Sequence, residues 1–182
     1  MKGYPMVVDL RGKSCVVVGG GKVAERKVKS LLAAGASVSV ISPKSTACFE
    51  DWAAAGKIAL IPRAFQQEDT AGAQLVIAAT DDPNTNLLVY HSIDTKQWIN
   101  IVDRPDLCTF TVPAVIERGA IQIAIGTSGT YPAFAKKLRE KIEELIGPEY
   151  ADHVQFLGEV RARIMATMPS CFSKLPPQPF SA

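Results

Sequence analysis

The chain has 182 residues, of which 47% are hydrophobic and 21% are charged, and its formal net charge is +2. This composition is typical of one globular domain, or of one domain with a small extension. The small net charge gives no indication of nucleic-acid binding. No segment approaches the roughly 20 apolar residues of a membrane helix, and the N-terminus lacks the apolar stretch of a signal peptide. We therefore expect a cytoplasmic protein with neither a nucleic-acid nor a membrane partner.

Apolar runs and helical patterns alternate over the first hundred residues. The helix expected at 22–34 has apolar residues at i, i+4, i+7 and i+8, and Gly35 follows it. The run 75–79 is uniformly apolar, which is typical of parallel strands buried on both faces. Strands are expected at 15–18, 37–41, 58–61, 75–79 and 99–102, and the other helices at 46–55 and 84–96. This alternation predicts an α/β fold with a parallel, Rossmann-type sheet.

The pattern changes near residue 105. Two β-rich runs, 109–116 and 120–125, are joined by Glu117-Arg118-Gly119 and predict a hairpin. Helices are expected at 132–146 and 149–168, with a frayed tail from 169 onward. This part is too small to bury a core alone, so it must pack on the first part or on another subunit. We expect three regions, 1–112, 113–147 and 148–182.

A glycine motif follows the first predicted strand. Gly19, Gly21 and Ala24 match G-x-G-x-x-G/A, in which the first glycine permits the turn and the second admits a pyrophosphate. The following helix supplies free N–H groups for phosphate. The alternative is a glycine-rich turn that binds nothing, but the strand before the motif and the helix after it favour a dinucleotide site. The residues expected to hold the cofactor here are Gly19, Gly20, Gly21, Lys22, Val23 and Ala24.

The second strand lacks the acidic residue that usually holds the ribose of NAD. Ser42-Pro43-Lys44 stands there instead. The Ser42 hydroxyl can bind a ribose hydroxyl, whereas Lys44 suits a 2′-phosphate, so the residues alone leave NAD and NADP open. All three are predicted cofactor residues.

Thr80, Asp81 and Asp82 follow the fourth strand. The carboxyl ends of strands in such sheets face the ligand, so we expect these residues to contact the cofactor. The alternative is a polar turn with Asp82 or Thr80 near the cap of the next helix, and both roles are compatible.

Several ordered blocks resemble the precorrin-2 dehydrogenases of sirohaem synthesis. They cover roughly residues 5–145 and include Val17-Val18-Gly19-Gly20-Gly21-Lys22-Val23-Ala24-Glu25-Arg26-Lys27, Ala78-Ala79-Thr80-Asp81-Asp82, Asn100-Ile101-Val102-Asp103, Phe110-Thr111-Val112-Pro113-Ala114 and Thr127-Ser128-Gly129. The resemblance implies NAD-dependent oxidation of precorrin-2 to sirohydrochlorin by a homodimer, with the hairpin region, 113–147, as its dimerisation part. Some relatives also insert ferrous iron. A loop serine is phosphorylated in at least one relative, and the matching position here is Thr127.

Asp103, at the end of the fifth strand, is the catalytic candidate. Its carboxylate could accept a proton or orient pyrrole N–H groups. The alternative is a helix or turn cap that pairs with Arg104. The substrate carries eight carboxylates, which basic groups should hold; those available are Arg104, Arg118, Lys136, Lys137 and Arg139.

No dedicated metal site is expected, because His91 and His153 show no ligand spacing and the four cysteines are scattered. Two other functions stay open. One is a nucleotide-sensing module, and the other is a chelatase without the redox step.

Overall fold

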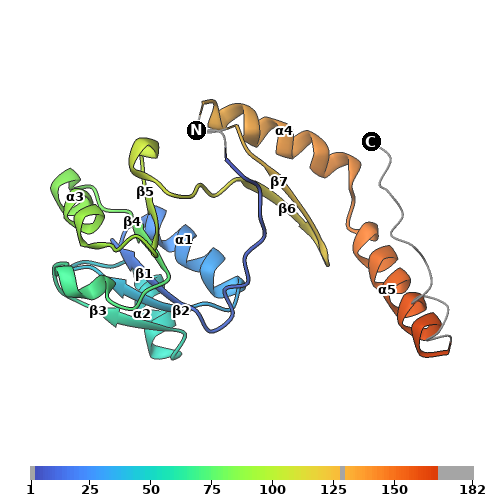
Figure 1. Cartoon of the computed structure of the whole chain (residues 1–182), viewed down its shortest axis with the longest axis horizontal. Coiled ribbons are helices and arrows are strands. Elements are labelled where there is room, and N and C mark those ends of the chain that lie inside the picture. Colours follow the sequence, from blue (N-terminus) through green and yellow to red (C-terminus); the bar gives the residue numbers. More distant parts are fainter. Residues whose placement is uncertain (1–2, 128–129, 168–182) are drawn as a thin grey trace. The chain divides into compact units, whose positions relative to one another are not determined.

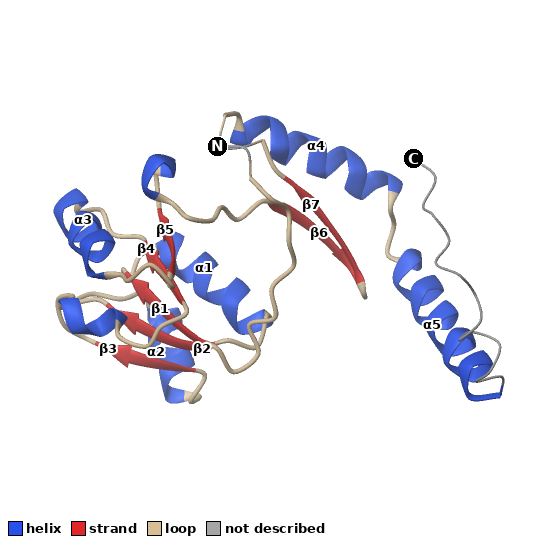
Figure 2. Ribbon diagram, viewed as in Figure 1, coloured by secondary structure: helices blue, strands red, loops and turns tan. Residues whose placement is uncertain are grey.

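The computed structural model describes residues 3–127 and 130–167. The chain divides into two units, Met1–Thr111, here the sheet unit, and Val112–Ala182, here the hairpin unit. Figures 1 and 2 show their elements in chain order. Along the described residues, no helix is both long and apolar enough to cross a membrane.

The sheet unit is built on five parallel strands in the order β3-β2-β1-β4-β5. They are β1 (Ser14–Val18), β2 (Ser37–Ile41), β3 (Ile58–Ile61), β4 (Leu75–Ala78) and β5 (Trp98–Ile101). The connecting helices are α1 (Lys22–Ala33), α2 (Ala47–Ala54), η1 (Gln67–Thr70) and α3 (Pro83–Ser92), and η2 (Pro105–Leu107) follows β5. The predicted α/β architecture is therefore confirmed, with strand boundaries shifted by one residue at most.

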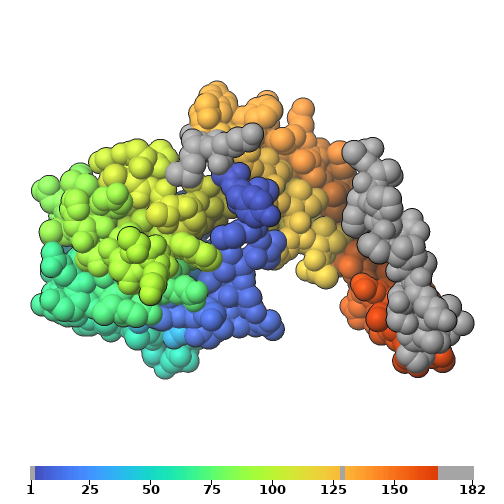
Figure 3. Space-filling model, viewed as in Figure 1, coloured from blue at the N-terminus to red at the C-terminus, as the bar shows by residue number. Residues whose placement is uncertain are grey.

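Both faces of the sheet are buried, which explains why β4 is apolar and buried along its whole length. Along β1, Cys15 and Val17 face the side covered by α1 and α2, while Val16 and Val18 face the side covered by α3. Phe49 of α2 is fully buried on the first side. In the space-filling view, side chains fill the spaces between the ribbons of this unit (Figure 3).

The third helix is shorter than predicted. It was expected to reach Lys96, but α3 ends at Ser92. The Asp94 N–H donates to Oε1 of Gln97 at 2.8 Å, and the buried Gln97 amide donates to the carbonyls of Thr70, the last residue of η1, and of Ala73. Side-chain hydrogen bonds thus replace helical ones in this segment.

The hairpin unit consists of β6 (Ala114–Arg118), β7 (Ile121–Ile125), α4 (Pro132–Leu145) and α5 (Glu149–Thr167). The prediction of a strand from residue 109 is wrong, because β6 begins only after Pro113, which lacks an N–H for a ladder. The turn is also tighter than predicted. Arg118 pairs with Ile121, which leaves Gly119 and Ala120 as the turn, with φ +57° at Gly119. The predicted last residue of α5, Met168, and the tail lie outside the described residues.

Candidate functional site

A cavity of about 1320 Å³ lies at the carboxyl ends of the strands of the sheet unit. Its lining comes from the segments that follow β1, β2, β3, β4 and β5, and from the start of α3. The strand order reverses at β1 and β4, and ligands of open α/β sheets bind at such a switch point. All cofactor candidates except Ala24 line this cavity, and so does Asp103.

The three glycines after β1 have different surroundings. Gly19 has φ +127°, and a β carbon there would lie 2.3 Å from the Ala79 carbonyl oxygen. A β carbon on Gly20 would lie 1.9 Å from the Lys44 carbonyl oxygen. One on Gly21 would meet nothing within 4 Å. Gly19 and Gly20 therefore admit neighbouring loops of this chain, and Gly21 leaves open space for a ligand.

The first turn of α1 offers backbone donors beside this open space. Gly21 is the N-cap and no side chain caps the helix. The first N–H to find a partner within the helix is that of Glu25, which donates to the Gly21 carbonyl at 3.0 Å. The N–H groups of Lys22, Val23 and Ala24 precede it, and a helix N-terminus attracts anions. Ala24 itself is buried against the sheet, as a small residue at the third motif position requires. This donor set fits a pyrophosphate.

The loop after β2 is ordered by its own hydrogen bonds. The buried Ser42 hydroxyl donates to the Lys44 carbonyl at 2.6 Å. Because the Ser42 hydroxyl donates its hydrogen within the loop, it could bind a ribose hydroxyl only as an acceptor in this arrangement. Pro43 and Lys44 are exposed and line the cavity.

The turn after β4 caps α3. Asp82 accepts from the backbone N–H of Thr85 at 3.1 Å and from its hydroxyl at 2.6 Å. The Thr85 hydroxyl, with two backbone N–H groups, lowers the pKa of Asp82. Thr80 contacts Asn86 through its hydroxyl at 2.8 Å. The prediction of a capping turn is confirmed for Asp82, while contact of Thr80, Asp81 and Asp82 with a cofactor stays a prediction.

Asp103 has an unusual backbone. Its φ is +63°, and it is the one non-glycine residue with positive φ in the described part of the chain. Such a conformation costs about 1 kcal/mol or more and is concentrated at functional sites. The predicted alternative, a pair between Asp103 and Arg104, is wrong: Arg104 instead pairs with Asp106 at 2.7 Å. The exposed Asp103 carboxylate lies at the cavity with no ion-pair partner among the described residues.

A buried thiol holds the loop that carries Asp103. The Ile101 N–H donates to Sγ of Cys108 at 3.1 Å, and the thiol lies 3.2 Å from the Arg104 carbonyl oxygen that accepts its hydrogen bond. Burial raises the pKa of Cys108, so the thiol stays protonated and structural. No pattern in the sequence indicates this role, because the contact depends on how the loop returns to β5.

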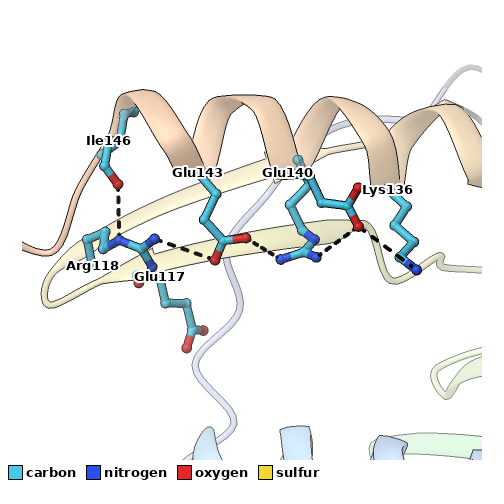
Figure 4. A network of polar contacts seen from close by, with 7 residues as sticks. Glu117, Arg118, Lys136, Glu140, Glu143 and Ile146 are labelled. Atoms are coloured by element: carbon cyan, nitrogen blue, oxygen red, sulfur yellow. Dashed lines mark hydrogen bonds and ion pairs between the residues drawn. The ribbon is translucent and has the colours of Figure 1, made fainter.

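Most of the basic candidates for substrate carboxylates are already paired. Arg118 donates from Nε to the Ile146 carbonyl at 3.1 Å and lies 3.5 Å from Glu143 (Figure 4). Arg139 bonds Glu143 at 2.6 Å, and Lys136 pairs with Glu140 at 3.9 Å. With Arg104 bound to Asp106, Lys137 is the candidate left without an ion pair among the described residues. The network joins β6 to the C-terminal end of α4, which is a structural role.

Comparison with known proteins agrees with the fold and the motif. Residues 6–114 match the family described as "Putative NAD(P)-binding", a range that contains the whole cavity lining, and residues 118–145 match "Sirohaem biosynthesis protein central". The solved structure of SirC, a precorrin-2 dehydrogenase, superposes with a TM-score of 0.80 at 31% identity, over 88% of this chain and 80% of that one. The chain belongs to the precorrin-2 dehydrogenase family. The predicted family resemblance is confirmed.

The chain is also similar to bacterial sirohaem synthases. Siroheme synthase 2 of Yersinia enterocolitica is 41% identical over 162 residues, or 88% of this chain and 34% of the relative. Siroheme synthase of Nitrosococcus oceani is 40% identical over 166 residues, or 90% of this chain and 35% of the relative. The chain thus spans about a third of the length of these curated relatives.

Proposed function

We propose that the chain oxidises precorrin-2 to sirohydrochlorin with NAD as the hydride acceptor. The observation that carries this proposal is that one cavity combines the uncapped start of α1, the open side of Gly21 and the unpaired carboxylate of Asp103. The identity of the substrate is inferred from the family and from the similarity to SirC, a precorrin-2 dehydrogenase.

The residues divide the work as follows. The α1 N–H groups and Gly21 bind the pyrophosphate, and NAD, when bound, supplies the two-electron acceptor. Precorrin-2 loses one hydride and one proton, so the protein must hold the reacting carbon and accept that proton. Asp103 is the group at the cavity placed to accept it or to orient pyrrole N–H groups.

Absorbance spectroscopy with precorrin-2 and NAD, in the absence of metal, tests the activity. Sirohydrochlorin formation is expected with the unmodified chain and at least a hundredfold less with Asp103→Ala, at the lower end of what a positioned acid or base supplies. Asp106→Ala is the matched control, because it removes a neighbouring exposed carboxylate. Equal rates for Asp103→Ala and the unmodified chain would refute the catalytic role.

Two further arms separate the alternatives. NADP in place of NAD tests whether Lys44 accommodates a 2′-phosphate. Sirohydrochlorin with Fe²⁺ tests chelation, an activity that some family members add. Turnover of neither NAD nor NADP, with chelation present, would identify a chelatase without redox activity; binding of NAD with neither reaction would identify a sensor.

We also infer a homodimer formed through the hairpin unit. None of the described residues of α5 is buried, and α4 buries only Ala135. Large apolar side chains of these helices are exposed, among them Phe134, Phe156, Leu157 and Met165. Such faces need a partner to be stable in water. Light scattering is expected to give twice the chain mass, and a folded monomer at micromolar concentration would refute the inference.

The cytoplasmic location and a modification at Thr127 stay predictions; Ser128 lies outside the described residues.

A further inference from the structure

The loop after β2 is fastened to the glycine turn by contacts that come from both sides. The Thr46 N–H donates to the Gly20 carbonyl at 3.1 Å. The Lys44 carbonyl occupies the space that a β carbon on Gly20 would fill. The Ser42 hydroxyl holds that same carbonyl at 2.6 Å. The position of the loop therefore depends on the turn, and both line the cavity.

A carboxylate of α1 completes this arrangement. Oε2 of Glu25 accepts from the Thr46 hydroxyl at 2.7 Å and from Nζ of Lys22 at 3.2 Å. The Glu25 side chain is 23% exposed, whereas that of Lys22 is 82% exposed. Hydrogen bonds to ionised groups are about twice as strong as neutral ones. The contact to Thr46 is also the largest cause of a lowered pKa of Glu25, which shows that it favours the ionised form.

We propose that Glu25 and Thr46 are positioning residues that hold the loop 42–46 for the adenosine half of the dinucleotide. Glu25 does not line the cavity, so it acts through Thr46, which does. The loop after the second strand is where dinucleotide-binding sheets hold the adenosine ribose. This chain has no acid at the end of β2, and its acid on α1 fixes the loop instead of binding the ribose directly. The inference rests on the proposed use of NAD.

The test measures dissociation constants of the purified full-length apoprotein by calorimetry. Thr46→Val removes the hydroxyl at nearly constant volume, and Thr46→Ser retains it. A lost hydrogen bond to a charged group predicts about tenfold weaker binding of NAD by Thr46→Val, while Thr46→Ser is expected to stay within about twofold of the unmodified chain. Glu25→Gln is expected to resemble Thr46→Val. Glu50→Gln is its matched control, since Glu50 is an exposed carboxylate on α2.

Fragments of the dinucleotide separate positioning from general damage. ADP-ribose should lose affinity for Thr46→Val by the same factor as NAD, whereas nicotinamide mononucleotide should not. An equal loss of affinity for both fragments would overturn the inference. Unchanged binding of NAD by Thr46→Val and Glu25→Gln would also overturn it. Failure of the unmodified chain to bind NAD would instead overturn the proposed function.

Discussion

Replacement of Gly20 by alanine is the sharpest test of how this site is assembled. The added β carbon would lie 1.9 Å from the Lys44 carbonyl oxygen and 2.8 Å from Oγ of Ser42. A carbon–oxygen contact of about 3.3 Å requires the loop to move by roughly 1.4 Å. Because the obstacle is backbone, no side-chain rotation relieves it.

Two losses are expected from this movement. Overpacking of this kind lowers the free energy of unfolding by about 2 kcal/mol. A displacement of about 1 Å in a positioning element lowers kcat/KM by about a hundredfold. Thermal unfolding measures the first, and initial rates at varied NAD concentration measure the second.

Gly21→Ala is the matched control in the same turn. Its β carbon would meet no protein atom within 4 Å, and its φ of −86° suits alanine. We expect unchanged thermal stability but weaker NAD binding, because the methyl group would occupy the open side of the turn. Wild-type stability and NAD affinity in Gly20→Ala would refute the packing argument, and full NAD affinity in Gly21→Ala would refute the assignment of the open side to the pyrophosphate.

Substitutions at three further residues probe the supporting contacts. Arg118→Ala removes the donor to the end of α4 and one partner of Glu143, so denaturant titration should show a loss of about 1–2 kcal/mol; an unchanged midpoint would contradict the structural role. Asp82→Ala removes the cap of α3 and should lower the melting temperature, whereas Asp82→Asn should restore most of it. Arg63 holds the pKa of Asp69 below its ordinary value, so the stability from this pair is complete above about pH 4 and is lost as the pH falls toward the folded pKa. The melting temperature should therefore fall more in the native chain than in Asp69→Asn below pH 4, and parallel curves would exclude the contribution.

The strands of the sheet unit could be predicted because burial on both faces leaves a simple pattern. Val16 and Val17 face opposite layers of helices, and both positions need apolar side chains. The motif at Gly19, Gly21 and Ala24 could also be identified from the sequence, since local sterics decide where glycine and alanine are required.

The supporting contacts could not be predicted, because they join residues far apart in the chain. Glu25 and Thr46 are 21 positions apart, and no periodicity relates them. The return of Cys108 to Ile101 depends on the path of a loop that contains a short 3-10 helix. The hairpin turn was predicted at 117–119 but lies at 119–120, because the register depends on the positive φ of Gly119.

At Asp103, the left-handed backbone conformation lowers the stability of the fold, while the side chain is the one proposed to act in the reaction. Glycine adopts φ +63° without the steric cost of a β carbon. Asp103→Gly should therefore raise the free energy of unfolding, by up to about 1 kcal/mol, while it removes the carboxylate assigned to the reaction. Selection of a variant library for thermal stability alone would therefore favour glycine at position 103, at the expense of the proposed activity. With the proposed role of its carboxylate, selection for turnover would instead keep the less stable aspartate.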